Sequence, residues 1–292
     1  MSYIYPANHT TGRAMFVWNK DSVDSTQEQA DLVAFCQTNK INCVLLSIYN
    51  WIGRYVWSTA NVDGLKALVS ALKTAGIAVY AVAGNDDWTV LQNWVRRTVL
   101  EPLRQYQAQC ESKEQFDGFV FDVEWFISDN DPQKHVPLMC DLMKDTKGIL
   151  NMPVGLWAPW WQITEDRSTG LVSYDGFLEP EGVHWMHVSD MVFVGAYSNI
   201  AESVSGQQGQ ISMLENWLSY VSTSGRRIPI WCTSETKQLS EGWQSYYGMT
   251  KSYMETQHAL IASAFLNEGS EGSTCFYGQC VHHYDTYKVM GG

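Results

Sequence analysis

Asp122 and Glu124, two positions apart, lie near the end of an apolar run at residues 116–125, Phe-Asp-Gly-Phe-Val-Phe-Asp-Val-Glu-Trp. Residues two apart in a β-strand share a face, so Asp122 and Glu124 project to one side while Phe121 and Val123 project to the other. Buried carboxylates are costly, so the pair must share a proton, bind a cation or meet a substrate. A shared proton raises the pKa of one acid, which makes Glu124 a candidate general acid near neutral pH. The alternative is a structural network of backbone hydrogen bonds and an ion pair.

Strand-like and helix-like segments alternate along the chain, which is typical of parallel strands joined by crossover helices. Most of the strand candidates are near-continuous apolar runs, as expected when both faces are buried. Eight such units in 292 residues predict an α/β fold, a (β/α)8 TIM barrel that forms a single domain over residues 1–292. A doubly wound open sheet is the second choice. The expected strands are residues 14–18, 44–48, 78–83, 118–123, 154–158, 191–196, 229–233 and 274–278, the last running on towards Tyr284.

Segments of helical period predict the helices between these strands. Ser25 and Glu28 have the spacing of a capping box, and Gly76 is a C-terminal stop signal. Residues 160–187 are irregular and rich in Gly, Trp and acidic residues, which indicates a long loop with only a short helix. The expected helices are residues 25–39, 63–75, 90–109, 134–149, 211–222 and 253–266.

Polar and aromatic residues follow the expected strands, at the end where a (β/α)8 barrel builds its active site. A Trp follows five of the eight strands, although Trp is normally rare and prefers partial burial. Flat indole faces stack on the C–H faces of sugar rings and also stabilise cations. We therefore expect substrate contacts from Trp18, Trp51, Asp86, Asp87, Trp88, Trp125, Trp160, His283 and Asp285.

The stretch Asp117-Gly118-x-x-x-Asp122-x-Glu124 resembles the DGxDxDxE signature that chitinase-like family 18 glycoside hydrolases carry on strand four of a (β/α)8 barrel. The resemblance implies that Glu124 is the proton donor and that Asp122 orients an acetamido group of the substrate. Val120 stands where the family has its first inner Asp. The stretch Gly-Ala-Tyr-Ser at 195–198 stands where the family has M-x-Y-D, so the Tyr is kept and the flanking Met and Asp are not.

A second acid, Glu235, directly follows the expected strand 229–233. Its place resembles that of the nucleophile on strand seven of many retaining glycosidase barrels, whose acid/base lies on strand four. This resemblance implies Glu124 as acid/base and Glu235 as nucleophile, about 5–5.5 Å apart. Asp122 and Tyr197 would tune the acid by charge and hydrogen bonding. The alternative for Glu235 is a loop acid or a helix cap.

Two further groups of side chains could act at the same mouth. Asp86 and Asp87, with Asp122 and Glu124, could form an oxygen-rich site for Mg²⁺ or Ca²⁺, but a run of Asp in a loop is more often a turn signal. We favour no metal and no cofactor. At most one of the adjacent residues His282 and His283 faces the pocket, and the parity of Asp285 favours His283.

The net charge limits the binding partners, and the spacing of the cysteines indicates the state of the thiols. The chain has 19 Lys and Arg against 31 Asp and Glu, a net charge of −12, which opposes binding to nucleic acid and to anionic membranes. The seven cysteines are scattered and never spaced as CxxC, so we expect all seven to be structural thiols, and a pairing of Cys275 with Cys280 is the first alternative. The first residues resemble no secretory signal, so a cytoplasmic location is expected, although a trimmed secreted form would look the same.

These observations favour a glycoside hydrolase-like enzyme that cleaves a glycosidic bond of an oligosaccharide or small-molecule substrate by carboxylate acid/base catalysis. An acid-initiated lyase or cyclase on an apolar substrate would use the same carboxylates and aromatic lining. A barrel that binds a sugar or a protein without catalysis is the third hypothesis, because fold does not imply function. No GxGxxG, P-loop or GxSxG motif is present, which argues against dinucleotide, nucleotide and serine-hydrolase chemistry.

Overall fold

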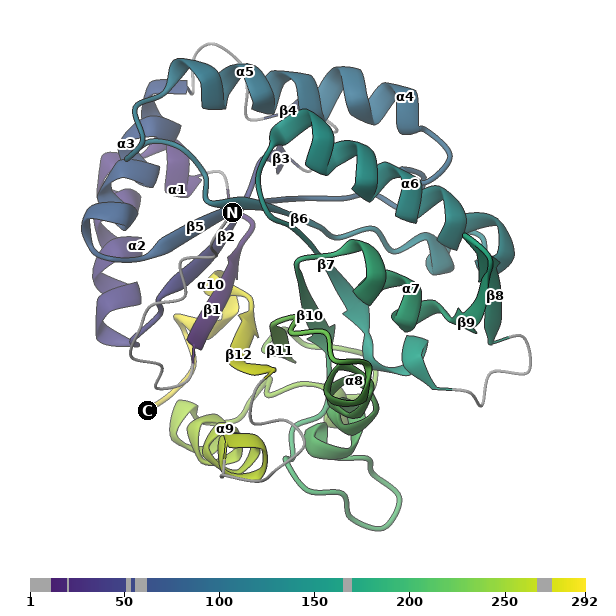
Figure 1. Ribbon diagram of the computed structural model, residues 1–292. Helices are drawn as coiled ribbons and strands as arrows, with labels where there is room; N and C mark the ends of the chain where they lie inside the picture. Colours follow the sequence, from purple (N-terminus) through teal and green to yellow (C-terminus); the bar gives the residue numbers. More distant parts are fainter. Residues whose placement is uncertain (1–11, 20, 51–53, 56–61, 165–169, 267–274) are drawn as a thin grey trace.

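In a computed structural model, the chain forms a closed barrel of eight parallel strands in the order β1-β12-β11-β10-β7-β6-β5-β2, which confirms the predicted fold (Figure 1). The structure describes residues 12–19, 21–50, 54–55, 62–164, 170–266 and 275–292. Each barrel strand lies within about two residues of its expected position. The barrel strands are β1 (Gly12–Val17), β2 (Cys43–Ser47), β5 (Ala78–Ala83), β6 (Gly118–Phe121), β7 (Val154–Pro159), β10 (Met191–Gly195), β11 (Ile230–Glu235) and β12 (Phe276–His282).

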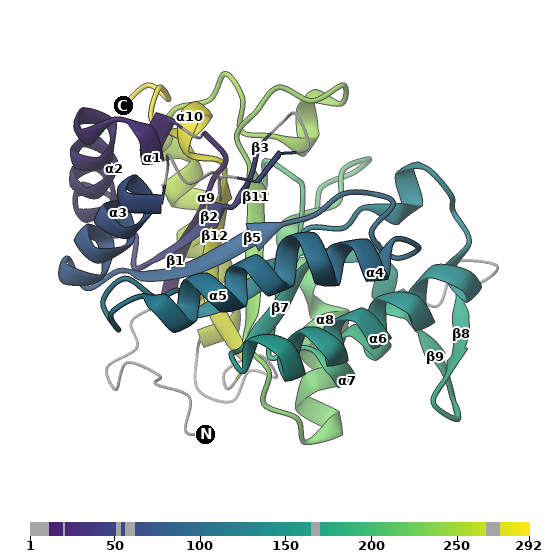
Figure 2. The same ribbon diagram turned by 90° about the horizontal axis from the view of Figure 1, so that it is seen from above.

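Helices surround the barrel on its outside (Figure 1, Figure 2). Ser25 is the N-cap of α2, since its hydroxyl accepts a hydrogen bond from the backbone N–H of Glu28 at 3.3 Å, but the reciprocal half of the capping box is not formed, because the Ser25 N–H donates to the carbonyl of Asp21. The helices are α1 (Asp21–Asp24), α2 (Thr26–Thr38), α3 (Val62–Thr74), α4 (Gln92–Val95), a π-helical turn (Arg96–Leu100), α5 (Glu101–Gln109), α6 (Pro132–Leu150), α7 (Glu181–Val188), α8 (Gln210–Ser224), α9 (Lys251–Leu266) and α10 (Tyr284–Tyr287). Short 3-10 helices span Trp125–Ile127, Trp160–Ile163 and Gly242–Gln244, and a second small sheet pairs β3 (Tyr49–Asn50) with β4 (Arg54–Tyr55).

The link between β7 and β10 contains a β-hairpin that the sequence analysis did not predict. Strands β8 (Leu171–Tyr174) and β9 (Phe177–Pro180) pair antiparallel, and α7 follows. The hairpin turn is Asp175-Gly176, and both residues have positive φ, 52° and 83°. An Asp-Gly pair with two positive φ angles is the type I′ turn that closes a two-residue hairpin, so the signal was in the sequence. The hairpin lies at the outer edge of the molecule beside α6 and α7 (Figure 2).

Apolar side chains form two layers, one inside the barrel and one between the barrel and the helices. The inner layer consists of Ala14, Phe16, Cys43, Leu45, Val82, Val120, Trp157, Met191, Phe193, Trp231 and Cys280. On β6, Phe119, Phe121 and Val123 belong to the outer layer. The alternation predicted for this strand is therefore confirmed: Val120 faces the inside of the barrel, and Asp122 and Glu124 follow it at two-residue steps.

The cysteines are buried thiols, and Cys275 and Cys280 form no disulfide. Among the described residues, no helix combines the length and the apolar character that a membrane span requires.

The end of β6 lies against a glycine at the end of β5. A Cβ on Gly84 would come within 1.6 Å of the carbonyl oxygen of Asp122, and the Asp122 N–H donates to the carbonyl of Ala83 at 3.1 Å. Any side chain at position 84 would therefore push the two strand ends apart and displace the first of the two candidate acids.

We expect Gly84→Ala to lower the free energy of unfolding by about 3 kcal/mol, the upper part of the range for overpacking. Gly148→Ala is the matched control. Gly148 is exposed within α6 and a Cβ there meets nothing within 4 Å, so that variant should gain about 0.5–1 kcal/mol from helix propensity. Urea unfolding of both variants measures the difference. Equal stabilities would contradict the close approach at Gly84.

Candidate active site

The carboxyl ends of the barrel strands bring together the acids that the sequence singled out. Glu235 on β11 and His282 on β12 are register partners, so their side chains both project into the barrel mouth. Asp122 and Glu124 reach the same mouth from β6, because the charges of both acids act on His282. Tyr197, which follows β10, feels the charges of Glu235, Asp122 and Glu124. The site therefore gathers groups from four different strands.

Glu235 is a nearly buried carboxylate with three N–H donors. Its Oε1 accepts hydrogen bonds from the backbone N–H groups of Thr236 at 2.8 Å and Lys237 at 2.7 Å. Its Oε2 lies 2.7 Å from Nδ1 of His282, and only 4 % of its side chain is exposed. Three donors on two oxygens solvate an anion inside the protein. Two of these donors are the backbone amides that directly follow the residue in the chain.

His282 also contacts the first strand. Nε1 of Trp18 donates to Nε2 of His282 at 2.7 Å, and the ring of Phe16 stacks on that of Trp18 at a centroid distance of 5.6 Å. Burial alone would lower the pKa of His282, but the hydrogen bond to Glu235 and the negative charges of the neighbouring acids raise it.

Asp122 and Glu124 both have raised pKa values. Burial, opposed in part by the charge of His282, raises the pKa of Asp122 to about 6. Burial, followed by repulsion from Asp122, raises the pKa of Glu124 to about 7, and Glu235 adds to the effect. Burial also raises the pKa of Tyr197 well above its ordinary value, so its phenol remains a hydrogen-bond donor. Near neutral pH, Asp122 and Glu124 therefore hold a proton between them, beside the phenol of Tyr197 and the carboxylate of Glu235.

Trp157 on β7 fills the space beside Tyr197. The two ring centroids are 5.8 Å apart, and a Cβ on Gly195 would lie 2.4 Å from the indole of Trp157. The Gly that stands where family 18 enzymes have Met thus leaves room for this indole. Val120 is fully buried in the inner layer, and the hydroxyl of Ser198 accepts from Gln207 at 3.2 Å. The three departures from the family pattern, at Val120, Gly195 and Ser198, therefore lie in apolar and structural contacts.

The expectation that Trp88 and Trp125 line the mouth is wrong. Both indoles are buried in the outer layer, with exposures of 0 % and 1 %. Trp88 packs edge-on to Phe121, and Trp125 stacks on the buried ring of His135 at 5.1 Å. Large aromatic side chains at strand ends gain more by covering the barrel under the helices than by facing water. Sequence position after a strand does not reveal which of the two sides a loop residue takes.

The preference for His283 is also wrong, because His282 is the histidine that meets the acids. On β12 the alternation that places Cys280 inside continues to His282. The parity argument failed because Asp285, which set it, lies in α10 beyond the strand. Nδ1 of His283 lies 3.7 Å from the carboxylate of Asp285 instead.

Asp87 and Trp160 make local contacts, and Trp51 lies outside the described residues. Asp87 belongs to a turn, where its carboxylate accepts from the side chain of Asn85 at 3.1 Å. Trp160 is partly buried and packs against the outer layer. Within the described ranges, no group of three or more His, Cys, Asp or Glu side chains is arranged to hold a metal ion.

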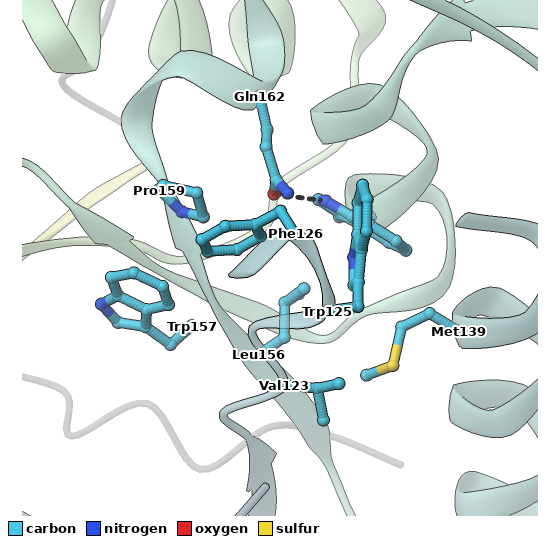
Figure 3. Close-up of a pocket in the computed structure, with 9 residues that line it drawn as sticks. Val123, Trp125, Phe126, Met139, Leu156, Trp157, Pro159 and Gln162 are labelled. Carbon is cyan, nitrogen blue, oxygen red and sulfur yellow. Dashed lines mark hydrogen bonds between the residues drawn. The ribbon is translucent and has the colours of Figure 1, made fainter. Parts of the chain in front are cut away.

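A small cavity lies behind the β6 and β7 ends, lined by Trp125, Trp157, Phe126 and other mostly apolar side chains (Figure 3). Gln162 is its main polar side chain, and the Oε1 of Gln162 accepts from Nε1 of Trp185 at 2.8 Å. The cavity has room for about one water molecule.

Sequence reasoning missed His282 and Trp157 as site residues. His282 lies two residues after Cys280 on the last strand, and Trp157 lies two residues after Gly155 on β7. Because residues two apart in a strand share a face, this spacing was the available signal in both cases. Both follow from the alternation that correctly placed Asp122 and Glu124.

No protein-family model matches this chain, and no curated protein matches it. Solved structures of glycoside hydrolases share its fold. A chitinase from Rhizomucor miehei aligns with a TM-score of 0.57 and 11% identity over 94% of this chain and 95% of that one. A chitinase from Chromobacterium violaceum gives 0.53 and 13% over 95% of both. An endo-1,4-β-mannanase from Eisenia fetida gives 0.54 and 9% over 96% and 86%. The chain therefore has a glycoside hydrolase-like (β/α)8 barrel, a likeness of fold alone.

We expect Glu124→Gln to stabilise the protein at high pH. Because the pKa of Glu124 is raised from 4.5 to about 7, the native state holds a proton that the unfolded state releases between these values. Its contribution to stability is thus present below about pH 4.5 and is lost as the pH rises to about 7. The variant, which does not titrate, should gain about 3 kcal/mol over the wild type on going from pH 4.5 to pH 8.

Urea unfolding at the two pH values measures this gain, with the exposed Glu241→Gln as control. The same difference between Glu124→Gln and the wild type at both pH values would show that Glu124 titrates normally.

Proposed function

We propose that this protein hydrolyses a glycosidic bond, with Glu124 as the general acid. The observation that carries the proposal is the pair of opposite environments at the mouth. Burial and repulsion from Asp122 raise the pKa of Glu124 to about 7, whereas Glu235 receives three N–H donors. Two carboxyl groups whose environments favour opposite protonation states are what acid catalysis with a carboxylate partner needs.

Glu235 is proposed as the nucleophile. In a retaining mechanism it would attack the anomeric carbon while Glu124 protonates the leaving oxygen, and Glu124 would then activate the water that releases the sugar. Asp122 would hold the proton of Glu124 at neutral pH through its negative charge, and the phenol of Tyr197 would donate to an oxygen in the mouth.

The charges of the site favour a neutral sugar. Asp122, Glu124 and Glu235 are acidic, and His282 is the ionisable base that acts directly on them. Such a mouth repels uronic acids and phosphorylated sugars and stabilises the positive charge that develops on the ring. The positions of Val120 and Ser198 disfavour a substrate-assisted route through an acetamido group, so we propose a non-acetylated oligosaccharide as substrate.

We expect Glu124→Gln to reduce kcat/KM on glycosides with poor leaving groups by about 10²–10⁴, the usual contribution of a general acid. The loss should be smaller on aryl glycosides, whose leaving groups need little protonation. In the wild type, activity should fall as the pH rises above about 7, where Glu124 loses its proton. Screening neutral, N-acetylated and anionic oligosaccharides measures these effects, with Glu241→Gln as the control carboxylate.

The same screen contains the outcomes that would overturn the proposal. Sugar binding without turnover in the wild type would support a binding barrel. Turnover of a prenyl or other apolar substrate with sugars ignored would support the lyase or cyclase chemistry. A loss of only about tenfold for Glu124→Gln on poor leaving groups would remove this residue from the acid role.

We expect Glu235→Ala to abolish hydrolysis of a non-acetylated aryl glycoside, and azide or formate to restore part of it by replacing the carboxylate. NMR of the first product should show a retained anomeric configuration in the wild type and an inverted azide adduct in the variant. Near-wild-type turnover by Glu235→Ala would assign the nucleophile elsewhere.

A further inference from the structure

Three residues from three adjacent strands form a hydrogen-bonded chain at the mouth. Nε1 of Trp18 lies 2.7 Å from Nε2 of His282, and Nδ1 of His282 lies 2.7 Å from Oε2 of Glu235. The two ends of the chain have opposite roles. An indole nitrogen can only donate a hydrogen bond, and an ionised carboxylate can only accept one.

These roles determine where the proton of His282 is. Because Trp18 donates, Nε2 of His282 must accept and therefore carries no proton. Because Glu235 accepts, Nδ1 of His282 must carry one. The geometry is satisfied by the neutral Nδ1-protonated tautomer. A doubly protonated ring would place two N–H groups head to head at 2.7 Å, so protonation of His282 requires Trp18 to move away.

We propose that Trp18 is a positioning residue that holds His282 in its neutral Nδ1-protonated tautomer, and that this tautomer keeps Glu235 an unneutralised anion facing the mouth. The proposal deepens the function proposed above and rests on it for the role of Glu235. It adds a role for Trp18 to the expected substrate contact, because Nε1 donates in the plane of the ring and leaves the stacking of its face a separate question.

The charged neighbours of His282 show why such a restraint is needed. Glu235 faces the ring from β11, Asp122 and Glu124 act on it from β6, and His283 lies beside it at a centroid distance of 5.1 Å. The three acids all favour an imidazolium. An imidazolium would form an ion pair with Glu235 and weaken it as a nucleophile, so the indole N–H opposes the surrounding charges.

Trp18 is itself held in place. Its ring stacks on Phe16 with an interplanar angle of 18°, and Phe16 is fully buried in the inner layer. Phe16 also meets the ring of His282 edge-on at 5.2 Å. The donor therefore rests on the core of the barrel rather than on a loop, and moving it costs packing as well as a hydrogen bond.

The test compares three variants of the whole protein with one control. Trp18→Phe removes the donor and keeps an aromatic ring. His282→Asn keeps an amide N–H near the position of Nδ1, whereas His282→Gln keeps an acceptor near that of Nε2. Trp217→Phe is the control, because the indole of Trp217 also donates one hydrogen bond, to the carbonyl of Trp160 at 2.9 Å, and lies outside the site.

Nitrogen-15 NMR of the imidazole groups reads the tautomer directly. The chain has seven histidines, and the signal missing from His282→Asn identifies His282. We expect the neutral ring of the wild type, above the raised pKa of His282, to carry its proton on Nδ1. In Trp18→Phe the pKa of His282 should rise by about one, a tenfold change in proton affinity. Trp217→Phe should leave this titration unchanged even where it lowers the melting temperature.

Activity gives the second readout. In Trp18→Phe the acid limb of the kcat profile should move to higher pH by about one, with KM changed less, because His282 stays protonated over a wider range. His282→Asn should keep more of its kcat than His282→Gln, because it retains a donor for Glu235.

A neutral ring with its proton on Nε2 in the wild type, or an unchanged His282 titration in Trp18→Phe, would overturn the inference. The NMR measurement of the tautomer does not depend on catalytic activity. A protein with the expected tautomer and no glycosidase activity would refute the proposed function and leave the Trp18–His282 restraint in place.

Discussion

The structure of the mouth depends on the cost of burying carboxylates. Each acid meets this cost in a different way. Glu235 is surrounded by N–H groups, two from the backbone that follows it and one from His282. For Asp122 and Glu124, no comparable set of donors comes from the described residues, and burial raises the pKa values of both acids so that they hold a proton. The asymmetry between Glu124 and Glu235, on which any acid/base chemistry would depend, is therefore a consequence of which strand supplies hydrogen-bond donors.

The barrel positions these groups through close backbone contacts. Gly84 allows the ends of β5 and β6 to meet, and this contact fixes where Asp122 leaves the strand. Gly195 allows the indole of Trp157 to lie flat against β10, next to Tyr197. In both cases a glycine, which has no side chain, leaves room for a group from the adjacent strand: the carbonyl of Asp122 at Gly84 and the indole of Trp157 at Gly195. The interior is packed densely enough that a methyl group added at these points would move a residue of the site.

The alternation of apolar residues predicted the barrel strands and the inward direction of Asp122, because a buried strand repeats strictly every two residues. The same rule extended beyond the strand failed for His283, since Asp285 belongs to a helix. Loop positions have no such period, so Trp88 and Trp125 could be placed after their strands but not on the correct side of the barrel. The hairpin turn at Asp175-Gly176 was readable from local chemistry, whereas the bond from Trp18 to His282 joins residues 264 apart and is fixed only by closure of the barrel.

Closure matters for the chemistry as well as for the fold. Because β1 and β12 are neighbours only in a closed barrel, the first strand can restrain a histidine on the last one. Positive charge that develops on a sugar in this mouth would favour the anionic forms of Asp122 and Glu235 and, for the same reason, would ease the loss of the proton from Glu124. That charge would also oppose protonation of His282. Under the proposed function, the anionic forms of Asp122 and Glu235 and the neutral form of His282 are thus the ones that an oxocarbenium-like transition state would favour, whereas Glu124 would give up its proton to the leaving group.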